Sequence, residues 1–525
     1  MARTSEPTER SLGRGDMASL DPEAGEKMVA LTGMPVEGRV GVVDIGSNTV
    51  RLVVYEAPTR LPIPVFNEKA LCRLGAGLGK SGKLNPAGVT AALKALRRFV
   101  GLSRAMGVSR LELVATAAVR DATDGAAFVR KVEEACEHPV TILTGAEEAR
   151  LAAVGVLNGC PGADGALADL GGGSLDLVGL DQGEIGTFAT LPLGHIRLAE
   201  DAGSDRARSR EIIARSFATV PWLTDISGKT LFCVGGSWRA LARIFIEQMH
   251  HPLHVVDAFT IDFFHALRLA DLVGHLSRAT LDKLDGVDAR RVDSLPVAAL
   301  TMAALVEATR PKEIVFSAFS MREGQMLELL PATLRSQDPL ISACESQAER
   351  TGRFGLGGIE IRDWMMPLFP EETRAEQRLR LAACLLSDLG WSEHPDYRAL
   401  HAYHRVLRIP YAGLTHPDRA ELALAILIRY GGDEDDRMVA PVHSLLDDRR
   451  RYRARVIGLA LRLAQTLSGG APGLLPHTRL ECDDETLRLL IPPKNEVFYS
   501  DAVERRFKRL ARATGRKEDI ARQAN

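Results

Sequence analysis

The sequence predicts an α/β fold made of two related units, followed by a helical half. Residues 167–178 read as a strand, Asp169, a Gly-Gly-Gly-Ser loop and a second strand with alternating apolar residues. Residues 40–54 repeat this order around Asp44. From about Pro331 onward, strand patterns give way to amphipathic helices. The two matched units predict an internal duplication whose loops face each other across a cleft.

The composition is that of an ordinary globular chain. Its 525 residues, 46% hydrophobic and 26% charged, are typical of roughly three or four soluble domains. A net charge of −2 gives no bulk attraction to nucleic acid or a membrane, and neither partner is expected. Seven cysteines without a Cys-x-x-Cys pair indicate reduced thiols and a cytoplasmic location. We find neither a membrane-spanning run nor a signal-peptide core.

The first half of the chain alternates strands and helices. Residues 1–38 are polar and aperiodic, so we expect a disordered tail. The expected strands are 40–43, 50–55, 111–115 and 140–143, and the expected helices are 83–106, 126–137 and 146–157. Such alternation with short links predicts a central mixed sheet covered by helices. A second half-core is expected from 166 to about 330.

The second half of the chain is predominantly helical. Amphipathic patterns predict helices at 376–389, 397–408, 418–430 and 449–467. Residues 478–491 alternate as a small strand pair, and Pro492-Pro493 ends it. A basic helix is expected to end the chain.

The glycine loops have features of a phosphate site. Glycine lets the backbone approach a ligand closely, and successive N–H groups can converge on one anion. Asp169 stands at the mouth of its loop, where a carboxylate can hold a cation that neutralises phosphate. No lysine follows Ser174 and no helix opens there, so this is not the usual phosphate loop. A glycine-rich hairpin can equally be purely structural.

Three segments resemble one known family. Asp44–Arg51 and Asp169–Ser174 resemble the two phosphate motifs, and Thr144–Arg150 the catalytic segment, of the exopolyphosphatase and guanosine pentaphosphate phosphohydrolase family. That family belongs to the actin-like phosphotransferase superfamily. The specific resemblance runs from about Arg39 to Leu330 and continues more loosely to the C-terminus.

The resemblance implies a domain plan. Two actin-like (ribonuclease H-like) domains are expected at 39–151 and 152–330, a helical HD-like domain at 331–474, and a small α+β extension at 475–525. It also implies a homodimer. The turn at Gly235-Gly236-Ser237 resembles the adenosine-side motif of the superfamily and is expected to pack close to the cleft, without implying ATP.

The resemblance also implies a Mg²⁺-dependent, processive hydrolase that removes the terminal phosphate of inorganic polyphosphate. Glu148 would activate the attacking water, and Arg120 would stabilise the phosphate charge. The implied metal ligands are Asp44, Asp169, Asp176 and Glu148. The implied phosphate-binding residues are Gly46, Ser47, Asn48, Thr49, Arg51, Gly171, Gly172, Gly173, Ser174, Gly235 and Gly236. The family often has glutamate at position 176, so the shorter Asp176 contacts metal directly or through water.

Each of these residues also has a structural interpretation. Glu147 and Glu148 fall in the first turn of a helix, where acids complement the helix dipole. Arg51 is equally compatible with a surface position at a strand end, and His195 with a structural role.

Two features of the helical half also carry alternatives. Ser387 stands where HD-type phosphohydrolases have a metal-binding histidine, so we expect the HD metal site to be absent, although His394, His401 and His404 lie nearby. Arg451, Arg453 and Arg455 are either a track for a long polyanion or a solvated basic face.

Three other functions remain open at this stage. Hydrolysis of the 5′-terminal phosphate of guanosine pentaphosphate would use the same site, and guanosine tetra- or pentaphosphate would then be a partner. A kinase of the same superfamily is disfavoured by the short loops and by the lack of a clear sugar-binding segment. A non-catalytic polyphosphate or alarmone sensor is disfavoured because Glu148, Asp169 and Ser174 are all present.

Overall fold

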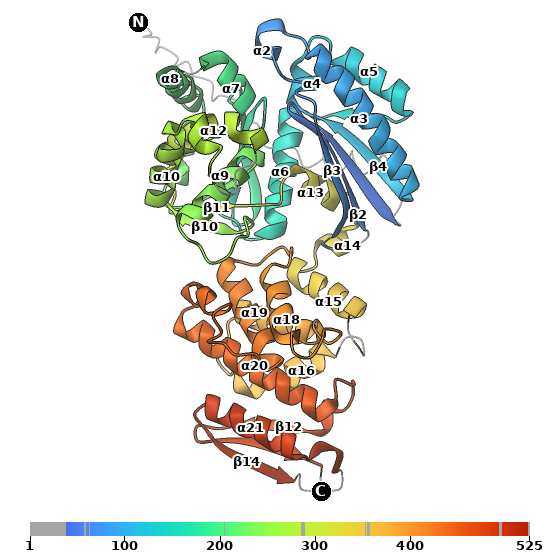
Figure 1. Cartoon of the computed structure of the whole chain (residues 1–525), viewed down its shortest axis with the longest axis vertical. Helices are drawn as coiled ribbons and strands as arrows, with labels where there is room; N and C mark the ends of the chain where they lie inside the picture. The colour runs from blue at the N-terminus through green and yellow to red at the C-terminus, as the bar shows by residue number, and fades with distance from the viewer. Residues whose placement is uncertain are drawn as a thin grey trace, which may run out of the picture.

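The computed structural model describes residues 38–522, apart from 57–58, 62, 204, 285–288, 352, 354–356 and 493–495. The predicted disordered tail therefore lies outside the described residues, except for Gly38. The molecule is elongated: two α/β units lie side by side at one end, a helical unit follows, and a small sheet with one helix lies at the other end (Figure 1).

The first unit is built on a mixed sheet of order β3-β2-β1-β4-β5. Its strands are β1 (Arg39–Ile45), β2 (Thr49–Glu56), β3 (Ile63–Leu71), β4 (Val108–Ala115) and β5 (Thr141–Ile142). The neighbours β1 and β2 are antiparallel, whereas β1 and β4 are parallel. Helices α3 (Pro86–Ala105) and α5 (Gly125–Cys136) cover one face of the sheet, and α2 (Leu78–Ser81) and α4 (Ala117–Asp121) are short.

The second unit repeats this topology. Its sheet has the order β8-β7-β6-β9-β11-β10, with β6 (Gly165–Leu170), β7 (Leu175–Asp181), β8 (Glu184–Leu191), β9 (Thr230–Val234), β10 (Phe259–Asp262) and β11 (Glu313–Phe316). Again an antiparallel hairpin is followed by a strand parallel to its first member. The surrounding helices are α7 (His195–Ala202), α8 (Arg206–Phe217), α9 (Gly236–Gln248), α10 (Phe263–His275) and α12 (Leu295–Thr309). The matched strand orders confirm the internal duplication.

Two helices join the sheets. Helix α6 (Gly145–Gly159) packs against α13 (Met321–Glu328), and one hydrophobic cluster combines them with apolar residues of both sheets. The two helices approach so closely that a Cβ on Gly324 would lie 1.9 Å from the Leu151 carbonyl oxygen. Glycine is therefore required where these backbones cross. The predicted boundary between residues 151 and 152 falls inside α6.

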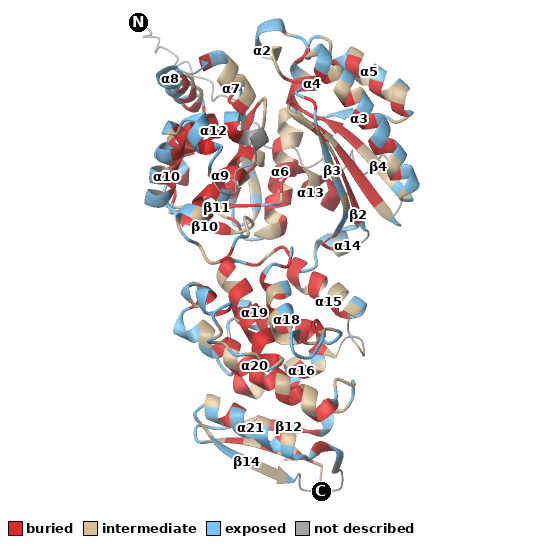
Figure 2. Ribbon diagram, in the orientation of Figure 1, coloured by how far each residue is buried: buried red, intermediate tan, exposed pale blue. Residues whose placement is uncertain are grey.

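The helical unit is built around one helix, α19, that is almost completely buried. It contains α15 (Pro339–Thr351), α16 (Gly358–Trp364), α17 (Arg374–Leu385), α18 (Arg398–Leu407), α19 (His416–Arg429) and α20 (Asp448–Ser468). All of α19 except its second and third residues is buried (Figure 2). The predicted helix 376–389 is shorter than expected, because a 3₁₀ turn at Leu386–Asp388 ends it early.

The small C-terminal sheet corrects the expected end of the chain. Strands β12 (Arg479–Cys482) and β13 (Thr486–Ile491) form the predicted pair, and α21 (Asp501–Ala513) is the predicted basic helix. The chain then continues into β14 (Lys517–Arg522), which pairs in parallel with β13. The sequence of β14 is mostly charged, so only pairing with β13 makes it a strand.

Among the residues that the structure describes, one helix meets the length and hydropathy criteria for a membrane span. The stretch Val292–Thr309 is long and apolar enough to cross a membrane, but 67% of it is buried inside the protein. A buried core helix satisfies the same criteria, so the feature is weak evidence for a span.

The helical unit contacts the second unit through polar side chains of α19. His416 Nε2 is 3.1 Å from the Asp257 carbonyl oxygen, and His416 Nδ1 is 2.7 Å from His251 Nε2. The carbonyl can only accept, so His416 carries its proton on Nε2 and accepts from His251. Arg419 Nη2 donates to Asp257 Oδ2 (3.4 Å), and the Ala318 amide donates to Asp257 Oδ1 (3.0 Å). The helical unit is thus tied to the loop that carries Ala318.

This junction is predicted to weaken in acid. Burial, with His251 and Arg419 nearby, lowers the pKa of His416 from 6.5 to about 3. As the pH falls, His416 is therefore protonated in the unfolded chain at a higher pH than in the folded protein. The free energy of unfolding decreases as the pH drops below about 6.5. Between the two pKa values, His416 lowers the free energy of unfolding by on the order of 1 kcal/mol for each pH unit. Urea-unfolding midpoints between pH 7 and pH 5 should shift less in His416→Asn than in wild type.

The matched control is His394→Asn, because the side chain of His394 is exposed on the same unit. We expect the control to follow the wild-type pH dependence. Identical pH dependence in wild type and His416→Asn would show that His416 does not link protonation to unfolding.

Candidate functional site

A cavity of about 910 Å³ lies where the hairpins of the two sheets meet. The two hairpin loops close in the same way: the Gly46 amide donates to the Thr49 carbonyl, and the Gly171 amide to the Ser174 carbonyl, both at 3.0 Å. The strand registers also match, since Asp44 stands opposite Arg51 and Asp169 opposite Asp176. The duplication therefore presents two equivalent loops, each with an aspartate at the end of its first strand.

The structure brings together most of the residues predicted for phosphate binding. The cavity is lined by Gly46, Ser47, Asn48, Thr49, Arg51, Gly171, Gly172, Gly173, Ser174, Gly235 and Gly236. The loops nearly touch: a Cβ on Gly172 would lie 2.9 Å from the Cβ of Ser47. Glycine allows this approach and leaves backbone N–H groups near one place.

His195 has the structural role that the sequence allowed. Its ring Nδ1 is 2.8 Å from the Gly171 carbonyl oxygen, and its backbone amide donates to the same oxygen at 3.1 Å. The next amide, of Ile196, donates to the Gly172 carbonyl. The start of α7 therefore holds the second loop in place.

The structure separates the roles of Glu147 and Glu148. Glu147 completes a capping box, because its carboxylate accepts from the Thr144 amide (2.8 Å) while its own amide donates to Thr144 Oγ1 (3.2 Å). Glu148 instead lines the cavity and accepts a hydrogen bond from Arg120 Nη1 (3.1 Å). The dipole interpretation thus applies to Glu147, and Glu148 is available for chemistry.

Glu148 is an unusually basic carboxylate. Burial and the nearby Asp176 raise its pKa well above the usual range, and Arg120 opposes this. Burial also raises the pKa of Asp176 to about 7. A carboxylate with a raised pKa is a better proton acceptor near neutral pH. The position and electrostatics of Glu148 therefore suit a general base.

Asp176 is buried at the base of the second loop. Its Oδ2 accepts from the Ser174 hydroxyl (3.2 Å), whereas its Oδ1 is buried with no hydrogen-bond partner among the described residues. An orphaned buried oxygen of this kind is unfavourable without a donor, water or ion.

Asp169 is enclosed by groups that the sequence did not identify. Ser320 Oγ donates to Asp169 Oδ2 (3.4 Å), and Arg239 lies close enough to lower the pKa that burial raises. Gly235 has φ +102°, and a Cβ there would lie 2.9 Å from Asp169 Oδ1. The predicted close packing of this turn against the cleft is therefore present.

Two buried arginines are the main site residues that sequence reasoning missed. Arg322 Nη1 donates to Asp44 Oδ2 (3.0 Å), and Arg239 has a buried Nη1 without a partner among the described residues. Burial, together with repulsion from Arg322, lowers the pKa of Arg239 to about 10. Both arginines line the cavity and lie near Arg51. Neither arginine was among the residues predicted for the site.

The arginine run on α20 is not one continuous exposed surface, so as a whole it fits neither the polyanion track nor the solvated basic face. Arg453 is buried and pairs with Glu372 (3.0 Å) and Glu421 (3.2 Å), so it cannot contact a substrate. Arg455 pairs with Glu434 (2.8 Å), and no carboxylate within the described ranges pairs with Arg451. The helical period places Arg453 on the inner face of the helix, and the prediction for it was wrong.

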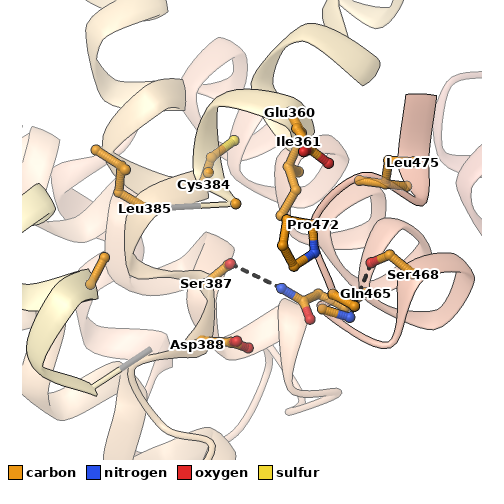
Figure 3. A pocket seen from close by; sticks show the side chains of 15 residues that line it. Glu360, Ile361, Cys384, Leu385, Ser387, Asp388, Gln465, Ser468, Pro472 and Leu475 are labelled. Atoms are coloured by element: carbon orange, nitrogen blue, oxygen red, sulfur yellow. Dashed lines mark hydrogen bonds between the residues drawn. The ribbon is translucent and has the colours of Figure 1, made fainter. Parts of the chain in front are cut away.

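The position of the missing HD-type histidine lies beside a very small pocket of about 30 Å³, enough for roughly one water molecule (Figure 3). In that pocket Gln465 Nε2 donates to Ser387 Oγ (3.2 Å). Arg353 and Arg429 both pair with Asp388, at 3.2 and 3.4 Å. Asp388 thus offsets the charge of both arginines, although the buried Arg429 Nε has no hydrogen-bond partner among the described residues, and the HD-like assignment stays a prediction.

Family models match most of the chain. A model described as the Ppx/GppA phosphatase family matches residues 53–333, and one described as the exopolyphosphatase C-terminal domain matches residues 359–521.

Individual relatives agree with this. A guanosine-5′-triphosphate,3′-diphosphate pyrophosphatase of Aeromonas hydrophila is 24% identical over 487 residues, which cover 89% of this chain and 95% of the relative. The protein of the same name from Aeromonas salmonicida is 24% identical over 469 residues, covering 86% and 92%. The crystal structure of an exopolyphosphatase from Cytophaga hutchinsonii shares the fold, with TM-score 0.50 and 23% identity over 55% of this chain and 96% of that one.

Replacing Gly235 by alanine should disturb the site. The new Cβ would meet the Leu170 carbonyl oxygen at 2.6 Å and displace Asp169. A displacement of about 1 Å can lower a catalytic rate by about 10²-fold, so we expect a loss of that size in phosphate release with the fold retained.

Gly228→Ala is the matched control, because Gly228 also has a positive φ (+77°) but faces open space. Both variants place alanine at a positive φ, and the backbone strain is greater at Gly235, whose φ of 102° and ψ of 156° are adopted almost only by glycine. Equal activities in the two variants would mean that contact with Asp169 does not matter.

Proposed function

Because the chain belongs to the Ppx/GppA phosphatase family, we propose that it is a phosphoanhydride hydrolase that removes the terminal phosphate of inorganic polyphosphate. The observation that carries this proposal is the position of Glu148 in a cavity lined by two glycine loops and buried arginines. These groups can bind a phosphate chain, and the basic carboxylate can take a proton from water.

In the proposed reaction, backbone amides of the two loops and the Ser47 hydroxyl hold the terminal phosphate. Arg120 holds the Glu148 carboxylate in place and adds positive charge near the reacting phosphate. Glu148 accepts the proton of the attacking water. Arg239 and Arg322, which line the same cavity, neutralise the phosphates behind the terminal one.

The carboxylates also fit a magnesium ion bound together with substrate. No group of three metal-binding side chains is preassembled among the described residues. Mg²⁺ commonly takes only one or two carboxylates and completes its shell with waters and phosphate oxygens. Asp169 and Asp176 suit this role, because both are buried and Asp176 Oδ1 lacks a partner. When bound, the ion would neutralise phosphate charge, which assists attack by water.

Guanosine pentaphosphate is the second candidate substrate. Both Aeromonas relatives named above cover most of this chain and carry a name referring to guanosine-5′-triphosphate,3′-diphosphate. The two substrates present the same terminal phosphate to the loops and differ only beyond it. Parallel assays of phosphate release from long polyphosphate and from guanosine pentaphosphate distinguish them: the proposal expects a higher kcat/KM for polyphosphate.

Glu148→Gln should abolish turnover while keeping substrate binding. The amide has the size of the carboxylate but cannot accept the proton, and removal of a general base costs roughly 10²–10⁴-fold in rate. Phosphate release and polyphosphate binding are measured on the same preparation. Glu147→Gln is the control, since glutamine preserves the capping box and this variant should stay active. A Glu148→Gln enzyme as fast as the control would exclude Glu148 as the base.

Asp169→Asn should raise the Mg²⁺ concentration needed for half-maximal activity and lower the maximal rate. The change removes one formal charge where a hard cation is expected. Asp181→Asn, at the exposed far end of the same hairpin, serves as control. A Mg²⁺ titration curve of Asp169→Asn that overlies both wild type and control would remove Asp169 from the metal site.

A further inference from the structure

The two equivalent aspartates of the duplicated hairpins have different surroundings. Asp44 and Asp169 each lie one residue before the end of the first strand of a hairpin. Across the hairpin, Asp44 stands opposite Arg51, whereas Asp169 stands opposite Asp176. The first hairpin therefore places an acid beside a base, and the second places two acids together. Equivalent positions in the duplication thus need not have the same role.

Asp44 is already bound by an arginine. Arg322 Nη1 donates to Asp44 Oδ2 at 3.0 Å, and the two side chains are only 11% and 17% exposed. The pair joins the first sheet to the start of α13. A buried, charge-assisted bond of this kind is short and directional, and loss of one partner leaves the other charge uncompensated. Asp44 therefore fixes where the Arg322 guanidinium lies.

The aspartates of the second hairpin are bound by neutral groups. Asp169 Oδ2 accepts from the Ser320 hydroxyl at 3.4 Å, and Asp176 Oδ2 accepts from the Ser174 hydroxyl at 3.2 Å. Asp176 Oδ1 is buried without a hydrogen-bond partner among the described residues. These two carboxylates keep their charge available for a cation, whereas the charge of Asp44 is paired within the protein.

The acids of the cleft form a series that begins at Glu148. After burial, Asp176 has the largest effect on the pKa of Glu148, and Asp169 also raises it. After burial, Arg322 has the largest effect on the pKa of Asp44. Arg322 also lowers the pKa of Asp169, which burial raises. Asp169 therefore lies between the general base at one side and the ion pair of Asp44 and Arg322 at the other.

Arginines surround the cleft on the far side of Asp169. Arg51, Arg239 and Arg322 all line the cavity, and we call them the arginine subsite. Arg322 Nε and Arg239 Nη1 are buried and have no hydrogen-bond partner among the described residues. Burial, together with Arg322, lowers the pKa of Arg51 as well as that of Arg239. Buried donors without acceptors are unfavourable, so a bound anion would stabilise this subsite.

The geometry of phosphoryl transfer gives this subsite a defined occupant. In an in-line displacement the attacking water and the leaving oxygen lie on opposite sides of the phosphorus. Glu148 holds the water, so the leaving phosphate lies on the side of the arginine subsite. As the bond to the bridging oxygen breaks, negative charge moves onto the leaving phosphate. Guanidinium groups fixed at that place stabilise the developing charge.

We propose that Asp44 is a positioning residue, which holds Arg322 against the phosphate next to the scissile bond, and that it is not a metal ligand. This inference rests on the proposed hydrolysis of polyphosphate and replaces the role that the family resemblance implied for Asp44. The duplication has thus diverged: the acid of the second hairpin serves the cation, and the acid of the first serves an arginine.

Binding of tripolyphosphate without metal tests this proposal. Isothermal titration calorimetry in EDTA measures its affinity for the whole chain while hydrolysis is stopped. Asp44→Asn should weaken binding about tenfold, because Arg322 loses its anchor and a charge-assisted contact is lost. A metal ligand would behave in the opposite way, since removal of a carboxylate that repels phosphate tightens metal-free binding. Unchanged or tighter binding by Asp44→Asn, or no binding by wild type in EDTA, would overturn the proposal.

Two variants serve as comparisons. Glu56→Gln makes the same charge change at the exposed end of β2, where Glu56 pairs with Arg39 at 3.6 Å, and it should bind like wild type. Asp169→Asn removes the equivalent acid of the second hairpin, and its metal-free binding should be unchanged or tighter. At saturating polyphosphate, the Mg²⁺ concentration for half-maximal activity should rise in Asp169→Asn but stay at the wild-type value in Asp44→Asn. A raised Mg²⁺ requirement in Asp44→Asn would make Asp44 a metal ligand.

A double variant tests whether Asp44 acts through Arg322. Arg322→Gln alone should weaken metal-free binding at least as much as Asp44→Asn. Adding Asp44→Asn to Arg322→Gln should change binding by less than about twofold, because the two residues then share one effect. The double variant removes both charges of the buried pair, so it remains informative if Asp44→Asn alone does not fold. A further loss of about tenfold in the double variant would show that Asp44 acts independently of Arg322.

These outcomes are distinguishable from failure of the proposed function. If wild type releases no phosphate from polyphosphate, the function itself is wrong and the inference falls with it. If wild type is active and Asp44→Asn binds tripolyphosphate as well as Glu56→Gln does, hydrolysis stands and the positioning role of Asp44 is wrong.

Discussion

The structure depends on the burial of four carboxylates around one cleft. Asp44, Asp169, Asp176 and Glu148 all have raised pKa values, in each case chiefly because of burial. Buried carboxylates are costly unless positive groups or hydrogen-bond donors accompany them. The surrounding structure supplies those groups from distant parts of the chain, and this requirement explains much of the architecture around the site.

The partners of these carboxylates come from both halves of the duplication. Arg322 and Ser320 lie at the start of α13, which crosses from the second sheet to pack on α6. The close crossing at Gly324 sets where this segment lies. The same segment begins with Ala318, whose amide is bound by Asp257, and Asp257 is in turn bound by Arg419 of the helical unit. The helical unit is thus connected to the loop that carries Ala318, a residue that lines the candidate site.

Local sequence patterns predicted the hairpins, most long helices and the positions of the glycine loops. They succeeded because strand alternation, helical spacing and glycine turns are local properties of the chain. They failed where pairing or burial comes from distant residues. Strand β14 is charged and becomes a strand only beside β13, and Arg453 resembles its exposed neighbours in sequence yet is buried against Glu372 and Glu421.

The sequence by itself determined the duplicated strand–Asp–Gly–strand units, which made Asp44 and Asp169 candidates, and the resemblance of Thr144–Arg150 to the catalytic segment made Glu148 one. The tertiary structure supplied the physical reason for the choice between two adjacent acids: Glu147 caps its helix, whereas Glu148 lines the cleft and pairs with Arg120. It also decided that Arg239 and Arg322 belong to the site and that Arg453 does not. The physical reason is that charge pairing and desolvation depend on through-space neighbours, which lie up to hundreds of residues away along the chain.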